Sequence, residues 1–234
     1  MAECWGRPRY VTTHNTTMAL NPLSGKQLWK VEHELPQDVF KMTCCGILNR
    51  GVAIFDGKIY RVTPDAHVLA MDAKTGKQLW KSKAANYLDG HAMTAAPLIA
   101  GGVVITGIAG GEYGTRGFID GWDPQSGKQL WRKYTTAAPG EKGGDTWPGD
   151  THAKGGAPTW LTGAYDPELD LVYLGHRQRR PLEPASPAWR QPVRVLGAGD
   201  AAQDRRIGLA LTVQPERRVW LRRHRSGHAG RPQD

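Results

Sequence analysis

The chain has 234 residues, a formal net charge of +9 at pH 7 and 39% hydrophobic residues, which is the composition of a folded protein of ordinary size. No apolar run reaches the ~20 residues that a helical membrane span needs, and the first residues lack the pattern of a signal peptide. This composition excludes a helical membrane protein, and three cysteines are too few for a disulfide-rich scaffold.

The positive charge is concentrated near the C-terminus. Residues 1–175 contain 18 Lys and Arg against 17 Asp and Glu, whereas residues 176–234 contain 13 arginines, 5 acidic residues and no lysine. All 7 tyrosines and all 3 phenylalanines also precede residue 176. We therefore predict two segments of different character that meet near residue 175.

A pattern of eleven residues occurs three times, at 19–29, 70–80 and 121–131. Each copy has Asn or Asp at its third position and ends in Gly-Lys-Gln-Leu-Trp, so that Trp29, Trp80 and Trp131 are 51 residues apart. Because Asx and glycine residues favour tight turns, each copy predicts a strand, a turn and a second strand.

Short apolar runs at residues 57–62 and 101–107 predict further strands between these repeats. Four short strands in each unit of about 50 residues are typical of a β-propeller blade, with the repeated tryptophan between neighbouring blades. The sequence thus predicts an all-β fold, a partial propeller of about three blades that belongs to a larger ring. A β-sandwich is the alternative, but it does not explain the equal spacing.

Five other stretches resemble the pyrroloquinoline quinone (PQQ) dependent alcohol dehydrogenases, a family of periplasmic eight-bladed propellers with the same tryptophan-docking repeat. They are Thr43-Cys-Cys-Gly-Ile-Leu-Asn-Arg-Gly51, Thr63-Pro-Asp-Ala-His-Val-Leu-Ala70, Gly110-Gly-Glu-Tyr-Gly-Thr-Arg-Gly117, Thr146-Trp-Pro-Gly-Asp150 and Gly155-Gly-Ala-Pro-Thr-Trp-Leu-Thr-Gly-Ala-Tyr-Asp-Pro167. The resemblance covers about residues 10–175, so we expect an uncertain start at 1–9, propeller blades at 10–175 and a separate tail at 176–234.

The resemblance implies a PQQ site. Cys44 and Cys45 would close a disulfide ring against one face of the quinone, and Trp160 would stack on the other. Arg50 would pair with a cofactor carboxylate, and Thr94 would form a hydrogen bond nearby. Considered singly, the cysteines could be buried thiols, Trp160 a core aromatic residue, and Arg50 and Thr94 solvated surface residues. Their positions in the family motifs favour the site.

Gly110, Gly111 and Glu112 match a further part of the family pattern. The resemblance places Glu112 on the catalytic metal, Ca²⁺ or a lanthanide, because hard cations prefer carboxylate oxygen. It implies oxidation of a small primary alcohol to an aldehyde by hydride transfer to PQQ, with a cytochrome c-type electron acceptor and a periplasmic location. The family's catalytic Asp has no counterpart in this chain, so we assign no catalytic residue and expect the chain to be inactive.

The family pattern stops at Gly175. Family members continue with Gly-Asn-x-x-Pro-Trp-Asn and then Arg-Pro-Gly-Asp-Asn-Leu-Tyr, whereas this chain continues with His176-Arg-Gln-Arg-Arg-Pro. Codons compatible with this tail, when shifted forward by one base, permit both missing motifs in the correct order. We therefore predict that residues 176–234 are an irregular, frameshifted tail in which the metal-binding Asn is lost.

Two other functions are compatible with parts of the sequence. A non-enzymatic propeller scaffold would have the same tryptophan repeat but would not need Cys44, Cys45, Glu112 and Trp160. A basic tail that binds nucleic acid or acidic lipid would explain the charge of residues 176–234. The frameshift interpretation predicts neither a nucleic-acid partner nor a membrane span.

Overall fold

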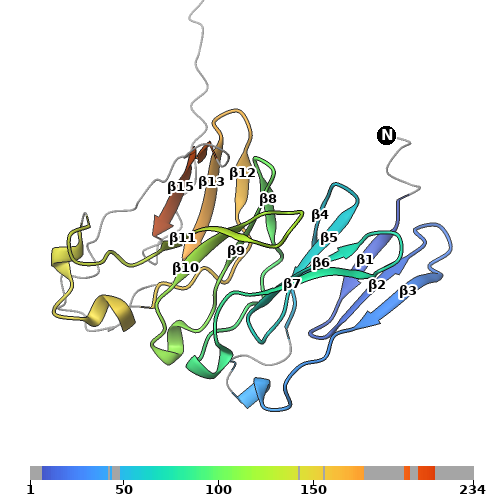
Figure 1. Ribbon diagram of the computed structural model, residues 1–234, viewed down its shortest axis with the longest axis horizontal. Helices are drawn as coiled ribbons and strands as arrows, with labels where there is room; N and C mark the ends of the chain where they lie inside the picture. The colour runs from blue at the N-terminus through green and yellow to red at the C-terminus, as the bar shows by residue number, and fades with distance from the viewer. Residues whose placement is uncertain are drawn as a thin grey trace, which may run out of the picture.

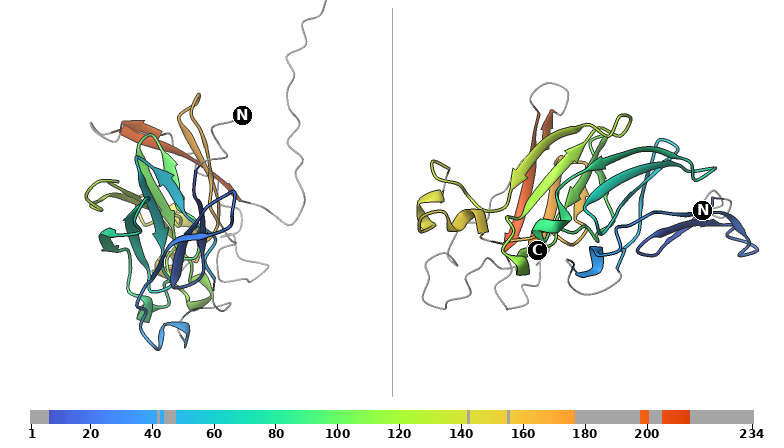
Figure 2. Two further views of the ribbon diagram at one scale, coloured as in Figure 1. Left: turned by 90° about the vertical axis from the view of Figure 1, so that its right-hand side faces the viewer. Right: turned by 60° about the horizontal axis from the view of Figure 1, so that its bottom comes forward.

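The computed structural model describes residues 7–41, 43, 48–141, 143–154, 156–176, 198–200 and 205–213. The described chain forms four β-sheets that stand next to one another in sequence order (Figure 1). In the right-hand view of Figure 2, the first sheet and the last lie at opposite ends of this row. The all-β class predicted from the sequence is confirmed.

The first three sheets are antiparallel, and their strands follow one another in sequence order. The first sheet contains β1 (Arg9–Thr12), β2 (Thr16–Leu20) and β3 (Gln27–Glu32). The second contains β4 (Ala53–Phe55), β5 (Lys58–Val62), β6 (His67–Asp72) and β7 (Gln78–Lys83). The third contains β8 (Leu98–Ala100), β9 (Val103–Gly107), β10 (Phe118–Trp122) and β11 (Gln129–Tyr134).

The fourth sheet has the strand order β12-β13-β15-β14. Its strands are β12 (Ala164–Asp166), β13 (Leu171–His176), β14 (Ala198–Asp200) and β15 (Arg205–Val213). β15 runs parallel to β13, whereas the other strand pairs in the four described sheets are antiparallel.

Strands β14 and β15 lie in the tail that we expected to be irregular, and His176 ends β13 instead of beginning the tail. The sequence of β15 after its two arginines, Ile-Gly-Leu-Ala-Leu-Thr-Val, is apolar and β-branched enough to pair with an open sheet edge. Residues 1–6, 177–197, 201–204 and 214–234 lie outside the described residues.

Short 3₁₀ helices connect the strands, and none of the described helices is long and apolar enough to cross a membrane. They are η2 (Val39–Lys41), η3 (Tyr87–Asp89), η4 (Gly111–Tyr113), η5 (Gly144–Thr146) and η6 (Thr151–Lys154).

The repeated turn has the geometry that its sequence predicts. In the second sheet, the Asp72 carboxylate accepts hydrogen bonds from the backbone N–H groups of Lys74 and Thr75 and from the Thr75 hydroxyl. Gly76 then adopts a φ of 75° and donates its N–H to the Asp72 carbonyl. A left-handed residue at this position explains why each copy of the repeat has glycine there.

The first two repeated tryptophans each join their sheet to the next one. Trp29 Nε1 donates to the Ala73 carbonyl at 3.3 Å, across from the first sheet to the turn of the second. Trp80 Nε1 repeats this contact with the Pro124 carbonyl at 3.1 Å. The sheets therefore pack through one recurring contact, which accounts for the spacing of 51 residues.

Apolar side chains fill the spaces between the sheets. One cluster joins the facing sides of the second and third sheets, and another joins the third sheet to β12 and β13. Members of the first include Tyr60, Val68, Val104, Phe118 and Trp122, and members of the second include Ile105, Ile119, Val172 and Leu174. Packing between the sheets holds the loops at their ends at fixed separations, and these loops carry the candidate site.

Candidate cofactor-binding site

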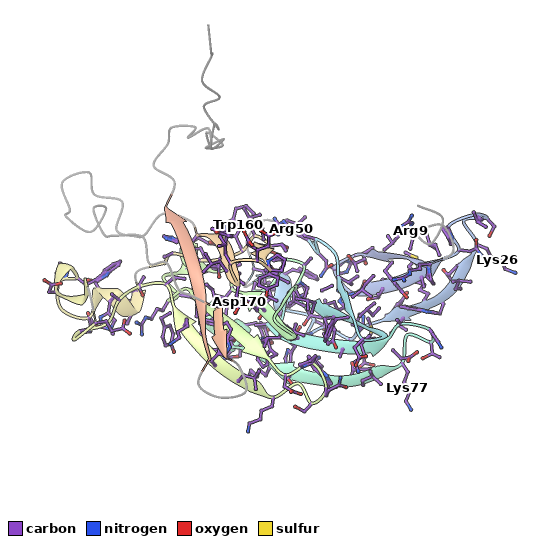
Figure 3. All side chains as sticks on the ribbon, turned by 90° about the horizontal axis from the view of Figure 1, so that it is seen from above. Arg9, Lys26, Arg50, Lys77, Trp160 and Asp170 are labelled. Carbon is purple, nitrogen blue, oxygen red and sulfur yellow. The ribbon has the colours of Figure 1, made fainter. Side chains whose placement is uncertain are left out.

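Five of the predicted site residues line a single pocket of about 190 Å³. They come from four loops that are far apart in the sequence. They are Arg50, Thr94, Gly110, Glu112 and Trp160. Figure 3 shows Arg50 and Trp160 next to one another on one side of the molecule, near the middle of its length.

Arg50 is held between a hydroxyl group and an aromatic ring. Its Nη1 donates to Thr94 Oγ1 at 2.5 Å, and its Cζ lies 4.9 Å from the centroid of the Trp160 ring. The backbone N–H of Arg50 also donates to the Thr94 carbonyl at 3.0 Å. A guanidinium group that lies over an indole is stabilised by the negative face of the ring, and it retains donors for an anion.

The loop that carries Arg50 is anchored by its neighbour Asn49. The Asn49 side chain donates to the Val62 carbonyl at the end of β5 and accepts a hydrogen bond from the Gly51 N–H, both at 3.0 Å. These bonds fix the backbone on both sides of Arg50, which limits the positions that its guanidinium group can reach.

Trp160 follows a residue that is bonded to β10 and to the residue directly after β9. The Thr159 hydroxyl donates to the Phe118 carbonyl at 2.8 Å and accepts from the Ile108 N–H at 3.1 Å. Two residues further on, the Thr162 hydroxyl donates to the Ala96 carbonyl at 2.8 Å. The indole therefore projects from a segment that is bonded on both sides.

Gly110 and Gly111 allow the loop with Glu112 to lie close to its neighbours. Gly110 has a φ of 117° and contacts the Gly90 carbonyl, so that a Cβ atom there would overlap it. A Cβ atom on Gly111 would lie 2.7 Å from Cδ of Pro158. Gly110 lines the pocket, whereas Gly111 is buried beside it.

Glu112 is the acidic residue among those that line the pocket. The described residues contain no group of three or more His, Cys, Asp or Glu side chains that could hold a metal ion. Glu112 can therefore supply carboxylate oxygen to a hard cation, but the described part of the chain does not complete the ligand set.

The remaining predicted site residues, Cys44 and Cys45, lie outside the described residues, as does Gly155 of the motif before Trp160. The proposed disulfide and the face of the quinone that it would cover stay predictions.

Further residues of the pocket were not predicted. They are Leu48, Gly90, Ala92, Ala109 and Tyr113. Ala109 and Tyr113 are directly adjacent in the sequence to the predicted residues Gly110 and Glu112, and this adjacency was the available signal. Gly90 and Ala92 flank His91, whose pKa is lowered mainly by burial, so its imidazole is neutral near pH 7.

Residues 9–181 match the family described as PQQ: Glucose/ethanol/alcohol dehydrogenase, beta-propeller domain. The chain belongs to this family. The family membership and the partial propeller fold predicted from the sequence are thereby confirmed.

Known relatives show how much of a family member is present. The chain is 39% identical over 210 residues to "Quinohemoprotein alcohol dehydrogenase ADH IIB" of Pseudomonas putida, a match that covers 85% of this chain and 29% of that protein. It is 38% identical over 153 residues to "Lanthanide-dependent methanol dehydrogenase" of Methylacidiphilum fumariolicum, covering 57% of this chain and 25% of the relative. The chain spans about 30% of the length of the curated relatives that it matches.

A solved structure of the family also matches the chain over part of its length. The structure described as "Europium-containing methanol dehydrogenase" superimposes with a TM-score of 0.69 and 32% sequence identity, covering 74% of this chain and 34% of that one. The sheets of this PQQ-family chain thus correspond to part of a family propeller.

The described pocket fits part of such a cofactor. A cation, a hydroxyl group and an aromatic ring suit a flat ligand with carboxylate groups. For a metal ion, the described residues of the pocket supply one ligand, the Glu112 carboxylate.

Proposed function

We propose that this chain supplies one wall of the PQQ site in a quinoprotein alcohol dehydrogenase that oxidises small primary alcohols to aldehydes. The supporting observation is the convergence of Arg50, Thr94, Glu112 and Trp160 from four separate loops on one pocket. A propeller scaffold without a catalytic role needs no such pocket, so the proposal and the scaffold alternative differ in whether PQQ binds.

Each residue of this wall has a distinct role in the proposal. The Trp160 indole covers one face of the planar ring system, and Arg50 pairs with a carboxylate at its rim. Thr94 fixes the direction of the guanidinium group through the hydrogen bond from Nη1. Cys44 and Cys45 would cover the opposite face as a disulfide. PQQ, when bound, supplies the electron-poor carbonyl that accepts the hydride of the alcohol.

Glu112 would place a carboxylate oxygen on Ca²⁺ or a lanthanide beside the quinone. One relative is named as lanthanide-dependent, and another is named "Methanol dehydrogenase [cytochrome c] subunit 1". For the whole enzyme we propose this metal requirement, a cytochrome c-type acceptor and a periplasmic location. Because the metal site is incomplete in the described residues and no family Asp is assigned, we propose that the 234-residue chain alone does not turn over alcohol.

Direct titration of the full chain with PQQ tests the pocket. We expect weak binding by calorimetry, because an incomplete ring of sheets does not hold both faces of the cofactor at a fixed separation. The variants Arg50→Gln and Trp160→Leu should each weaken that binding several-fold.

A matched control is available in Arg116, whose Cζ lies 3.8 Å from the centroid of the Tyr134 ring, outside the residues that line the pocket. Arg116→Gln and Tyr134→Leu should leave PQQ binding unchanged. The proposed site would be contradicted if the two pairs of variants lost PQQ affinity equally, or if the chain bound no PQQ at millimolar concentration. Alcohol oxidation by the chain itself would show that it is not an incomplete enzyme.

A further inference from the structure

The short helix η4 determines where Glu112 lies. The Glu112 side chain lines the pocket, but none of the described residues forms a hydrogen bond or an ion pair with its carboxylate. The direction of the carboxylate therefore depends on the backbone of η4, in which the Tyr113 N–H donates to the Gly110 carbonyl at 2.9 Å. A helix of three residues has too few internal hydrogen bonds to be stable alone, so its neighbours must hold it in place.

The neighbour of η4 is η3, and Gly90 at the end of η3 lies between the two. Figure 1 shows both short helices together, below the second and third sheets. Beside them, Ala92 and Ala109 exchange backbone hydrogen bonds of 3.3 and 2.8 Å. Gly90 has a φ of 88°, and its N–H donates to the Tyr87 carbonyl at 2.9 Å. The position of Gly90 is thus fixed by η3.

The side chain of Tyr113 lies directly on Gly90. A Cβ atom built on Gly90 would be 2.5 Å from Cβ and 2.9 Å from Cγ of Tyr113, so only a hydrogen atom fits between them. Because Tyr113 is 45% exposed, its ring contributes little to an apolar core. The contact instead sets the distance between η3 and η4.

A hydrogen bond connects η3 in turn to the segment after the first sheet. The Tyr87 hydroxyl donates to Asp38 Oδ1 at 2.9 Å, and the next residue, Val39, is completely buried. Contacts therefore run without a break from Val39 through Tyr87 and Gly90 to η4. This series of contacts can hold an otherwise unsupported helix at a fixed place in the pocket.

We propose that Tyr113 and Gly90 are positioning residues for Glu112. The ring of Tyr113, seated on Gly90, holds η4 against η3 and so keeps the Glu112 carboxylate at the pocket. This role rests on the proposed function, in which that carboxylate binds Ca²⁺ or a lanthanide beside PQQ. Neither Tyr113 nor Gly90 supplies a ligand to the cation, and each acts through the position of Glu112.

The effect of metal on the PQQ affinity of the full chain is the readout. A cation between the Glu112 carboxylate and the carboxylates of PQQ should strengthen binding several-fold, whereas these like charges repel one another in its absence. Calorimetry gives the dissociation constant for PQQ without metal and with Ca²⁺ or La³⁺. The ratio of the two constants cancels any change in PQQ binding that does not involve the metal, and metal that binds free PQQ affects every variant alike.

Two substitutions of Tyr113 test the ring. Tyr113→Ala removes the ring from Gly90, so it should lose most of the metal effect, as should Glu112→Gln. Tyr113→Phe keeps the ring on Gly90 and should retain the metal effect. A loss of the metal effect in Tyr113→Phe equal to that in Tyr113→Ala would overturn the proposal, because the hydroxyl group and not the contact with Gly90 would then be responsible.

A substitution of Gly90 tests the other side of the contact. Gly90→Ala places a methyl group against Tyr113 and forces η4 away from η3, so the metal effect should fall. Gly140→Ala is the matched control for backbone strain, because Gly140 has a similar φ of 83° but nothing lies within 4 Å of a Cβ atom built on it. This control should keep the metal effect of the unmodified chain, and equal losses in the two glycine variants would overturn the proposal.

Glu112→Gln separates a failure of this role from a failure of the proposed function. If Glu112→Gln abolishes the metal effect but Tyr113→Ala and Gly90→Ala retain it, the proposed metal ligand stands and the positioning role is wrong. If metal does not strengthen PQQ binding to the unmodified chain, or if Glu112→Gln retains the effect, the proposed metal ligand is wrong and the positioning role fails with it.

Discussion

Gly127 lies directly on the indole of Trp80: a Cβ atom built on Gly127 would be 2.6 Å from both Cδ2 and Cε3 of the ring. The glycine also has a φ of 71°, which disfavours any other residue. The same position therefore carries two separate constraints, one from the turn and one from the contact between the second and third sheets.

These two constraints can be separated by experiment. Gly25 has nearly the same φ, 68°, but nothing lies within 4 Å of a Cβ atom placed on it. Gly25→Ala should cost about 1 kcal/mol from backbone strain alone. Gly127→Ala should cost roughly 1–3 kcal/mol more, because the indole must move. Urea unfolding of the two variants measures the difference, and equal losses would show that the contact with Trp80 contributes nothing.

Arg61 joins the first two sheets through hydrogen bonds to backbone oxygens. Its side chain is fully buried, and its guanidinium group donates to the carbonyls of Thr13, His14 and Thr16. We expect Arg61→Met to lower the free energy of unfolding by about 3 kcal/mol, since these buried carbonyls lose their donors.

The matched control for Arg61 is Lys58→Met on the same strand. Lys58 pairs with Asp56, whose side chain is 59% exposed, so its removal should cost less than about 1 kcal/mol. Similar losses in both variants, measured by chemical denaturation, would contradict the role given to Arg61.

His33 should make the stability of the chain depend on pH. Burial, with a smaller effect from the Arg61 charge, lowers the pKa of His33 to about 4, well below its ordinary value of 6.5. The folded state therefore favours neutral His33. Above pH 6.5 the imidazole is neutral in the folded and the unfolded state, so the full stability is present. As the pH falls from 6.5 toward 4, the unfolded state binds a proton that the folded state does not, and stability is lost. We expect the free energy of unfolding to decrease by about 1 kcal/mol per pH unit in this range.

Substitution identifies the source of this slope. His33→Gln retains a group that can hydrogen-bond to Thr17 Oγ1, which lies 3.0 Å from His33 Nε2, but it cannot titrate. The slope between pH 6.5 and 4.5 should become shallower in this variant and should not change in His14→Gln. Identical slopes in all three proteins, from urea unfolding at each pH, would refute the assignment.

The sequence predicted those parts of the fold that depend on local turn chemistry. An Asx residue with glycine four positions later, as at Asp72 and Gly76, predicts this turn. Three hairpins and the contacts of Trp29 and Trp80 therefore followed from the repeat. The pairing of β15 with β13 could not be predicted in this way, because an open sheet edge accepts whichever strand reaches it. The composition of residues 176–234 and the end of the family motifs predict an irregular tail instead.

The candidate site was predicted through motifs and not through contacts. Arg50 and Trp160 were identified because each stands in a family motif, yet no pattern in the sequence indicates that they touch each other. Their contact depends on the packing of the sheets that hold their loops. Gly90, which must be small to admit the ring of Tyr113, has no signature in a single sequence.

The last prediction concerns the nucleotide sequence near the codon for His176. None of the expected family motifs follows Gly175, although the family match extends to residue 181. In the structure β15 pairs with β13 in parallel, and among the described residues Trp131 Nε1 has no acceptor like those of Trp29 and Trp80. If residues 176–234 are a frameshifted translation, a shift of one base at this codon should open a long reading frame that contains further tryptophan-docking repeats. Sequencing the coding DNA is the measurement. An early stop codon in the shifted frame, or a long frame without such repeats, would show that the basic tail is the true continuation of the chain.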